Sequence, residues 1–247
     1  MVGMLSQASI ISPRSESPLQ VKICGIMREA DALHAAAMGA DMVGLVFASS
    51  RRRITPELAA QIATCLSSLE QPPLTVGVFV NEAEETIFTT ASSGELDIIQ
   101  LSGDETAEEV GRIALRYPVI KALRFPHETT VNKAMSVCEE YLSAVPKGRV
   151  QLLIDTYQPG SYGGTGETSD WRLAAHLAAR YPIFVAGGLN PNNVADAIAS
   201  MSLVGVDVSS GVEKDGKKDS SLITEFIQAA KPHSLGQFPN NTLHHGA

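Results

Sequence analysis

The chain of 247 residues carries a net charge of -8, and 44% of its residues are hydrophobic. This composition suits one large α/β domain with a sizeable core, and it gives nucleic acid no general attraction, so we expect no nucleic-acid partner. No apolar run is long enough to cross a bilayer, and we expect no membrane association. The three cysteines, Cys24, Cys65 and Cys138, form no CxxC pair, which argues against a disulfide framework or a zinc site and favours a reducing, cytoplasmic location.

Both ends of the chain differ from the middle. Residues 1–18 lack the basic region that opens a signal peptide, and residues 231–247 are polar and rich in turn formers. We expect two disordered tails around a single folded domain at residues 19–230.

Between the tails, one pattern repeats along the chain. A short β-branched run is followed by a loop with Gly, Ser, Asp or Asn, and then by an amphipathic stretch rich in Ala and Leu. This pattern predicts eight strands, at Val21–Cys24, Met42–Phe47, Thr75–Val80, Asp97–Leu101, Val119–Phe125, Val150–Asp155, Pro182–Ala186 and Val204–Val208. It predicts helices after the strands, for example at Glu29–Met38, Pro56–Leu66, Ala107–Tyr117 and Trp171–Arg180.

Strands that alternate with helices form a parallel sheet, and eight such units in a chain of this length predict a closed (β/α)8 TIM barrel, a single-domain α/β fold. The competing architecture, an open doubly wound sheet, usually carries GxGxxG after its first strand. Here that position reads CGIMR at residues 24–28. We therefore expect functional residues at the carboxyl ends of barrel strands.

Cys24 ends the first predicted strand. A cysteine in such a place is more often a small buried hydrophobic residue, and that interpretation suits Cys65 and Cys138 in the helices. At Cys24, strand alternation puts Lys22 on the same face, and a nearby ammonium favours the thiolate. Cys24 is therefore a candidate catalytic residue.

Asp155 ends the sixth predicted strand, after the run from Val150 to Ile154. Apolar surroundings disfavour a charged carboxylate, so this group could keep a proton near neutral pH and act as a general acid. The alternative is a turn residue that starts the loop at Thr156–Gly166, and the position alone does not decide between the two.

Three further side chains lie near predicted strand ends. Arg52 follows the second strand and could hold a carboxylate through two parallel hydrogen bonds, although arginine runs are often only solvent-exposed. Gln100 in the fourth strand and Asp207 in the eighth are candidate substrate-binding residues. By alternation, Asp207 points to the same side as Ser209.

Loops that contain glycine follow the last three predicted strands. A single Gly-Gly is usually just a turn, but three such loops at consecutive late strands match the recurrent phosphate site of this fold. Asn190 and Pro191 suit the cap and first turn of a helix after the seventh strand, whose amides would add partial positive charge. The predicted phosphate-binding residues are Gly164, Gly187, Gly188, Ser209, Ser210 and Gly211.

Eight motifs lie along the chain in this order: VKICGI at 21–26, GLVFASSRRRITPE at 44–57, VGVFVN at 76–81, DIIQLSGDE at 97–105, LLIDT at 152–156, YGGTGETSDW at 162–171, AGGLNPNNV at 186–194 and GVDVSSGVEKDGKKD at 205–219. As a set and in this order, they resemble the phosphoribosylanthranilate isomerase family, over essentially all of the chain except the two tails.

The resemblance implies an Amadori rearrangement in tryptophan biosynthesis, with no metal or other cofactor. It implies Cys24 as general base, Asp155 as general acid and Arg52 as the family's arginine after strand two. The implied partner is a small phosphorylated substrate, and we expect a monomer or a homodimer. Ser102 and Glu167 depart from the family pattern, where His and Lys are common; neither position is that of the acid or the base.

Two other interpretations stay open. Another sugar-phosphate barrel enzyme, such as a metal-dependent epimerase, would need His and Asp ligands at several strand ends, and the predicted strand ends carry no His. A non-catalytic sensor of a phosphorylated ligand would need neither Cys24 nor Asp155. It predicts tight binding without turnover.

Overall fold

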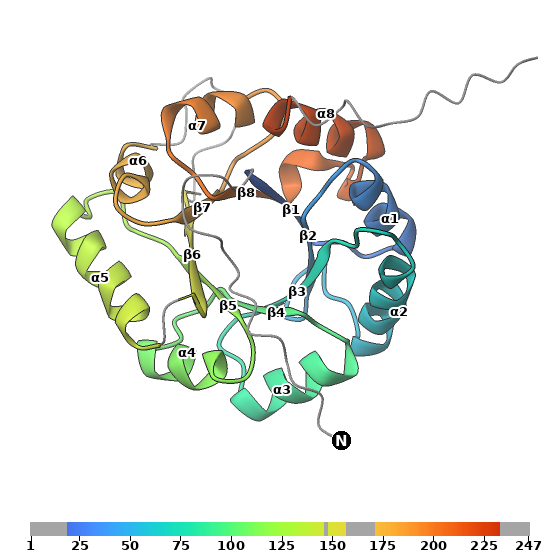
Figure 1. The fold of residues 1–247 in the computed structure, drawn as a ribbon, viewed down its shortest axis with the longest axis horizontal. Coiled ribbons are helices and arrows are strands. Elements are labelled where there is room, and N and C mark those ends of the chain that lie inside the picture. Colours follow the sequence, from blue (N-terminus) through green and yellow to red (C-terminus); the bar gives the residue numbers. More distant parts are fainter. Residues whose placement is uncertain (1–18, 146–147, 157–170, 233–247) are drawn as a thin grey trace, which may run out of the picture.

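The computed structural model describes residues 19–145, 148–156 and 171–232, and Figure 1 shows them arranged around a central barrel. Eight parallel strands form the closed barrel in chain order, with the eighth paired back to the first. The strands are β1 (Gln20–Cys24), β2 (Met42–Val46), β3 (Leu74–Phe79), β4 (Ile98–Leu101), β5 (Val119–Leu123), β6 (Val150–Asp155), β7 (Ile183–Ala186) and β8 (Gly205–Val208). The predicted (β/α)8 barrel is confirmed.

Helices surround the barrel (Figure 1). They are α1 (Glu29–Ala37), α2 (Pro56–Ser67), α3 (Glu84–Ser93), α4 (Ala107–Ala114), α5 (Val131–Ser143), α6 (Arg172–Ala178), α7 (Val194–Ser200) and α8 (Ser220–Ala230). Between β8 and α8, a short 3-10 helix η1 (Ser210–Val212) leads into a hairpin of β9 (Glu213–Lys214) and β10 (Lys217–Lys218). Several helices start where a side chain accepts a backbone N–H, as Thr55, Thr106, Thr130 and Asp219 do.

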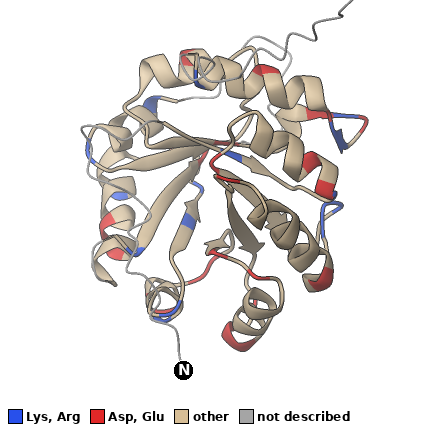
Figure 2. Cartoon of the chain, turned by 45° about the vertical axis from the view of Figure 1, so that its right-hand side comes forward, with Lys and Arg blue, Asp and Glu red and all other residues tan. Residues whose placement is uncertain are grey.

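The two-residue period of the strands separates the barrel interior from the layer under the helices. Met42, Ile98 and Phe184 lie inside the barrel, whereas Val43 and Ile99 pack in the layer between strands and helices. Most charged residues lie on helices and loops, and the strands are mainly uncharged (Figure 2). Charged groups at the strands therefore need either a partner or a function.

Most predicted elements keep their bounds within two residues. Helix α4 is the exception, since it ends at Ala114 rather than Tyr117, and Leu115 beyond it is 72% exposed. Strand β5 ends at Leu123, shortly before Pro126, which has no N–H to continue the ladder.

The start of α7 differs from the sequence-based prediction. Pro191 does not open the helix, which begins at Val194. The side chains of Asn190 and Asn193 instead bond the backbone of a preceding turn: Asn193 Oδ1 accepts from Asn190 N at 2.8 Å, and Asn190 Oδ1 accepts from Asn192 N at 2.9 Å. Such local bonds compete with the helix.

The predicted tails lie almost wholly outside the described residues. Lys231, the first residue of the C-terminal one, donates to the Gly39 carbonyl at 3.0 Å and pairs with Asp41, so contacts with the barrel extend to this residue. In the described ranges no helix has both the length and the apolar character needed to cross a membrane.

Candidate active site

Strands β1 and β8 bring three reactive side chains together inside the barrel. Lys22 on β1 donates to Asp207 on β8 at 2.9 Å, and these side chains are 0% and 9% exposed. Cys24 lies two residues along β1 from Lys22, at the carboxyl end, and is 8% exposed. The structure thus places Cys24 and Asp207 at the mouth of the barrel, as the strand pattern predicts.

Opposing effects act on the pKa of the Cys24 thiol. Burial raises the pKa of the Cys24 thiol, the Lys22 ammonium offsets this only in part, and Asp207 adds to the rise. Burial alone would lower the pKa of Lys22, but Asp207 and Cys24 raise it above its usual value. Lys22 favours the thiolate, as the strand pattern predicts, but burial and Asp207 together outweigh its effect on the Cys24 pKa. A thiolate with a raised pKa is scarcer, but it is a stronger base when it forms.

Asp155 ends β6, and its side chain is 17% exposed. Its surroundings include a cation that the sequence pattern does not predict. Arg124, which follows β5, donates through Nε to Asp155 Oδ2 at 2.9 Å, and the Arg124 side chain is 62% exposed. The candidate acid therefore stands beside a solvent-exposed cation.

Gln100 lies on β4 and is 5% exposed. Its Nε2 donates to Ser102 Oγ at 3.1 Å, while its Oε1 is buried and has no hydrogen-bond partner among the residues that the structure describes. A buried amide oxygen without a donor costs free energy. A ligand N–H or O–H at this position would satisfy it, which supports Gln100 as a substrate-binding candidate.

The loops after β7 and β8 lie against each other. Gly187 and Gly188 follow β7 with φ angles of 91° and 69°, and Ser209 leads from β8 into η1. A Cβ on Gly211 would lie 1.8 Å from the Leu189 carbonyl oxygen, so this contact between the two loops requires glycine. The late loops therefore meet at the part of the rim where the sequence predicts the phosphate site.

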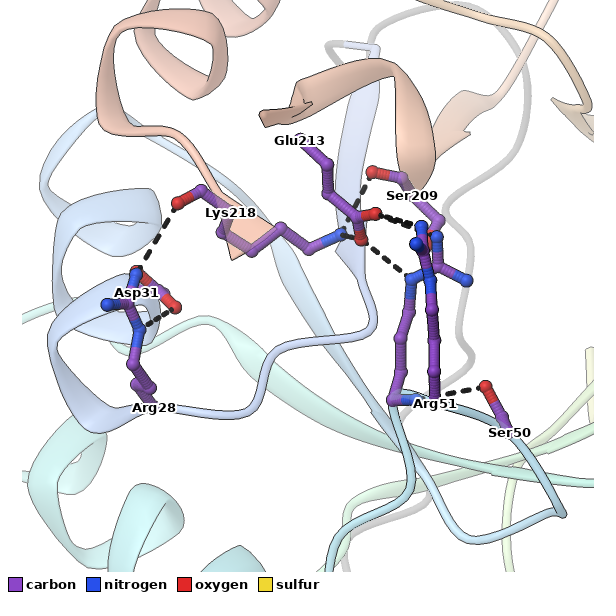
Figure 3. Close-up of polar contacts among 8 residues, drawn as sticks. Arg28, Asp31, Ser50, Arg51, Ser209, Glu213 and Lys218 are labelled. Carbon is purple, nitrogen blue, oxygen red and sulfur yellow. Dashed lines mark hydrogen bonds and ion pairs between the residues drawn. The ribbon is translucent and has the colours of Figure 1, made fainter. Parts of the chain in front are cut away.

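Glu213, at the start of the β9–β10 hairpin, accepts hydrogen bonds from three cationic side chains (Figure 3). Its Oε1 accepts from Arg52 Nε at 2.6 Å and from Lys218 Nζ at 2.8 Å. Its Oε2 accepts from the NH2 groups of Arg52 at 2.8 Å and Arg51 at 2.7 Å. Burial would raise the pKa of Glu213, but hydrogen bonds from Arg52 and Lys218 lower it to about 2. Arg52, the predicted carboxylate ligand, thus already holds a carboxylate of the protein.

Glu213, Lys218 and Arg124 are not among the site residues predicted from the sequence. A signal for the first two was present, because Asp215-Gly216 is a typical two-residue hairpin turn. Both turn residues have positive φ, at 51° and 75°, and the hairpin puts Lys218 opposite Glu213. Counting alternate residues beyond β5 would have pointed to Arg124.

The structure describes only part of the predicted phosphate site. Gly164 lies outside the described residues. Within residues 19–145, 148–156 and 171–232, no group of three or more His, Cys, Asp or Glu side chains is placed to hold a metal ion.

A barrel with a thiol and a carboxylate at the carboxyl ends of its strands, and with a predicted phosphate position at its late loops, resembles the (β/α)8 enzymes of phosphorylated small molecules. The family model for N-(5'phosphoribosyl)anthranilate (PRA) isomerase matches residues 21–229. An N-(5'-phosphoribosyl)anthranilate isomerase from Roseiflexus castenholzii is 46% identical over 215 residues, which are 85% of this chain and 97% of that protein.

Solved structures agree. Phosphoribosyl anthranilate isomerase from Thermotoga maritima superposes with a TM-score of 0.75 at 41% identity, covering 87% of this chain and 99% of that one. A phosphoribosyl anthranilate isomerase in complex with reduced 1-(o-carboxyphenylamino)-1-deoxyribulose 5-phosphate gives a TM-score of 0.72 at 38% identity, with coverage of 87% and 99%. The chain belongs to the N-(5'-phosphoribosyl)anthranilate isomerase family. It is an isomerase of tryptophan biosynthesis, as the sequence motifs imply.

Proposed function

We propose that Cys24 and Asp155 are the base and the acid with which this isomerase converts N-(5-phosphoribosyl)anthranilate to 1-(2-carboxyphenylamino)-1-deoxyribulose 5-phosphate. The observation that carries the proposal is the arrangement of the rim. Strands β7 and β8, whose loops are predicted to bind phosphate, stand between β6, which ends at Asp155, and β1, which ends at Cys24. A ribose whose phosphate lies at these loops has an acid on one side and a base on the other.

The rearrangement needs one proton delivered and one removed. Protonated Asp155 donates to the ring oxygen of the ribose, the bond from C1 to that oxygen breaks, and the nitrogen lone pair forms a Schiff base at C1. The Cys24 thiolate then removes the proton from C2. That electron pair moves toward the nitrogen, and the resulting enolamine relaxes to the aminoketone. Each proton transfer uses a positioned side chain, the usual role of such groups.

The binding roles are part of the same proposal. Asp207 and Gln100 bind the sugar, because Lys22 fixes the first and the second has a buried oxygen in need of a donor. Arg52 binds the substrate's carboxylate. The phosphate is bound by the loops that contain Gly164, Gly187, Gly188, Ser209, Ser210 and Gly211.

Replacement of either catalytic group tests the proposal. Cys24→Ala and Asp155→Ala should each lower kcat by about two to four orders of magnitude, the usual worth of a general acid or base. Turnover is followed as the loss of fluorescence of freshly made phosphoribosylanthranilate. Cys65→Ala on α2, the same chemical change away from the mouth, is the matched control and should keep its kcat. Near-parental kcat in a folded Cys24→Ala or Asp155→Ala enzyme contradicts the assignment.

A non-catalytic sensor on the same scaffold predicts ligand binding without turnover, so the wild-type rate in this assay also separates the two functions. The substrate is the small phosphorylated partner in this proposal. A cytoplasmic location and a monomeric or homodimeric state stay predictions from the sequence and from membership of the family.

A further inference from the structure

The ion pair between Arg124 and Asp155 is unexplained by the chemistry above. A general acid must carry a proton, yet a guanidinium at hydrogen-bond distance favours the ionised carboxylate. The pairing of Leu123 with Ile154 in adjacent strands puts Arg124 directly beside Asp155, and the contact is 2.9 Å long. The local fold therefore builds this contact into the mouth of the barrel.

Arg124 is placed where a ligand can reach it. Ile120 and Ala122 on β5 point into the barrel, and the same alternation directs Arg124 over the mouth. Its side chain is 62% exposed, and ion pairs at such exposure are weak and readily exchanged. Within the described ranges only its Nε has an assigned acceptor, so the terminal nitrogens are available for a carboxylate.

Arg52, by contrast, is constrained. It uses Nε and NH2 on Glu213, and its side chain is only 19% exposed. A guanidinium holds a carboxylate most strongly through two parallel hydrogen bonds. The Nε edge of Arg52, which could make such a pair, is already bonded to the Glu213 carboxylate. A substrate carboxylate has two oxygens, and Arg52 alone offers it only the remaining N–H groups.

Among the described residues, the charged side chains on the neighbouring strands do not duplicate Arg124. Next to β6 on its other side, β7 is formed by the uncharged residues Ile183–Ala186. Strands β1 and β8 carry Lys22 and Asp207, which pair with each other, and Cys24. Among these flanking strands, the cation beside Asp155 comes from β5.

We propose that Arg124 is a second carboxylate-binding residue, and that the substrate's anthranilate carboxylate displaces Asp155 from it. In the structure the Arg124 guanidinium donates to the Asp155 carboxylate at 2.9 Å. Once the substrate's carboxylate occupies Arg124, Asp155 is released from this ion pair, and ring opening needs Asp155 as a proton donor. This exchange couples recognition of the substrate's carboxylate to release of Asp155 from its ion pair with Arg124, and it rests on the acid role proposed for Asp155.

The test combines a variant enzyme with removal of the substrate's carboxylate. The kcat/KM values of wild type, Arg124→Ala and Arg124→Lys are measured with phosphoribosylanthranilate and with the corresponding phosphoribosylaniline, which lacks only the carboxylate. Arg112→Ala is the matched control, because Arg112 is an exposed arginine on α4 that also pairs with carboxylates, those of Glu84 and Glu108.

Arg124→Ala should lower kcat/KM for the anthranilate compound about 10- to 100-fold, the worth of a hydrogen bond to a charged group. It should not lower kcat/KM for the aniline compound. Arg124→Lys should recover part of the loss, and Arg112→Ala should change neither value. An equal loss on both substrates would show a purely structural pair, and no loss on either would show that Arg124 does not meet the carboxylate; both results overturn the proposal. Asp155→Ala tests the acid role separately, so the two failures are distinguishable.

Discussion

Arg52 reaches the mouth of the barrel with two of its nitrogens bonded to Glu213. Lys22 is likewise paired with Asp207 before any ligand binds. Long cationic side chains lose much rotamer freedom when they are ordered. Because these ion pairs order them during folding, substrate binding does not have to meet that cost again.

Replacement of Arg52 should therefore affect substrate handling more than replacement of its neighbour. We expect Arg52→Ala to weaken transition-state binding, measured as the change in kcat/KM, by about 1.5–3 kcal/mol. This is the range for hydrogen bonds to a charged group. Arg51 is 59% exposed and touches Glu213 through NH2 alone, so Arg51→Ala should cost less. Steady-state kinetics give kcat/KM of the two variants and show which arginine contributes more. A larger effect at Arg51 would show that the arginine after strand two is assigned in the wrong register.

At the scale of elements, the β9–β10 hairpin ties several loops of the mouth together. Lys218 donates to the Ser209 carbonyl at 2.9 Å, after β8. Its own carbonyl accepts from Arg28 NH2 at 3.4 Å, after β1, and Glu213 holds Arg51 and Arg52, after β2 (Figure 3). The hairpin thus fixes the rim between the candidate base and the predicted phosphate loops.

Glu213→Gln tests this arrangement through stability. The change leaves buried Lys218 without its counter-charge, and we expect a loss of about 1–3 kcal/mol in the free energy of unfolding at pH 7. The pKa of folded Glu213 is about 2, below the ordinary value of 4.5. Its contribution is therefore fully present above about pH 4.5 and is lost as the pH falls toward 2.

Urea unfolding of wild type and Glu213→Gln at several pH values measures this contribution. The difference between them should be constant from pH 7 to about 5 and should then shrink with further acidification. Glu108→Gln, in a surface ion pair whose carboxylate is 87% exposed, is the control and should change little. A difference that is the same at pH 3 and pH 7 would show that the charge of Glu213 is not what stabilises the hairpin.

The strands were more predictable than the contacts of the long side chains. The run Val150–Asp155 gave the bounds of β6 directly, because burial and a two-residue period leave a clear pattern. The partners Arg52 and Glu213 are 161 residues apart, and no local pattern links them. Sequence could place Cys24, Asp155 and Asp207 at strand ends, but closure of the barrel decides which charges meet.

At the scale of the whole molecule, the end of the chain returns to its first strand. Asp41 Oδ2 accepts from the backbone of Val21 on β1 at 2.6 Å and also pairs with Lys231, just after α8. Helix α8 packs against α1, α7 and β1, and its Phe226 is fully buried. The contacts that close the domain thus extend to Lys231.

A chain limited to residues 18–231 should keep its melting temperature within about 2–4 °C and its activity, because a loss of 1 kcal/mol shifts a domain of this size by about that much. Calorimetry and the turnover assay check both. A chain that ends at Asp219, before α8, is the control and should lose cooperative unfolding, because it gives up the helix that covers β1. A large loss in the 18–231 chain would show that one of the tails docks on the barrel.

Charge is unevenly distributed around the mouth, and this bears on a second substrate. Some barrels that resemble this family also rearrange a histidine-pathway intermediate that carries a phosphate at each end, and they need a second anion site at the early strands. Here the Glu105 carboxylate accepts from the backbone of Asn81 at 2.9 Å and of Gly103 at 3.0 Å, and from Lys121 Nζ at 2.7 Å. The amides and the cation that could bind a second phosphate already hold a carboxylate.

The early loops therefore disfavour a phosphate group, whereas the late loops are predicted to bind one. A phosphate carries up to two negative charges, and each close carboxylate costs about 1 kcal/mol in water-like surroundings and more as the dielectric falls. Because the early amides and Lys121 already bind Glu105, and Glu82 adds a negative charge after β3, kcat/KM for the bis-phosphorylated substrate should be at least about 100-fold below that for phosphoribosylanthranilate. Both substrates are assayed at equal enzyme concentration, and the difference should narrow as salt screens the exposed carboxylates. Comparable kcat/KM values would mean that Arg51 or Arg53 reaches across the mouth to hold the second phosphate, and that the barrel is not limited to one.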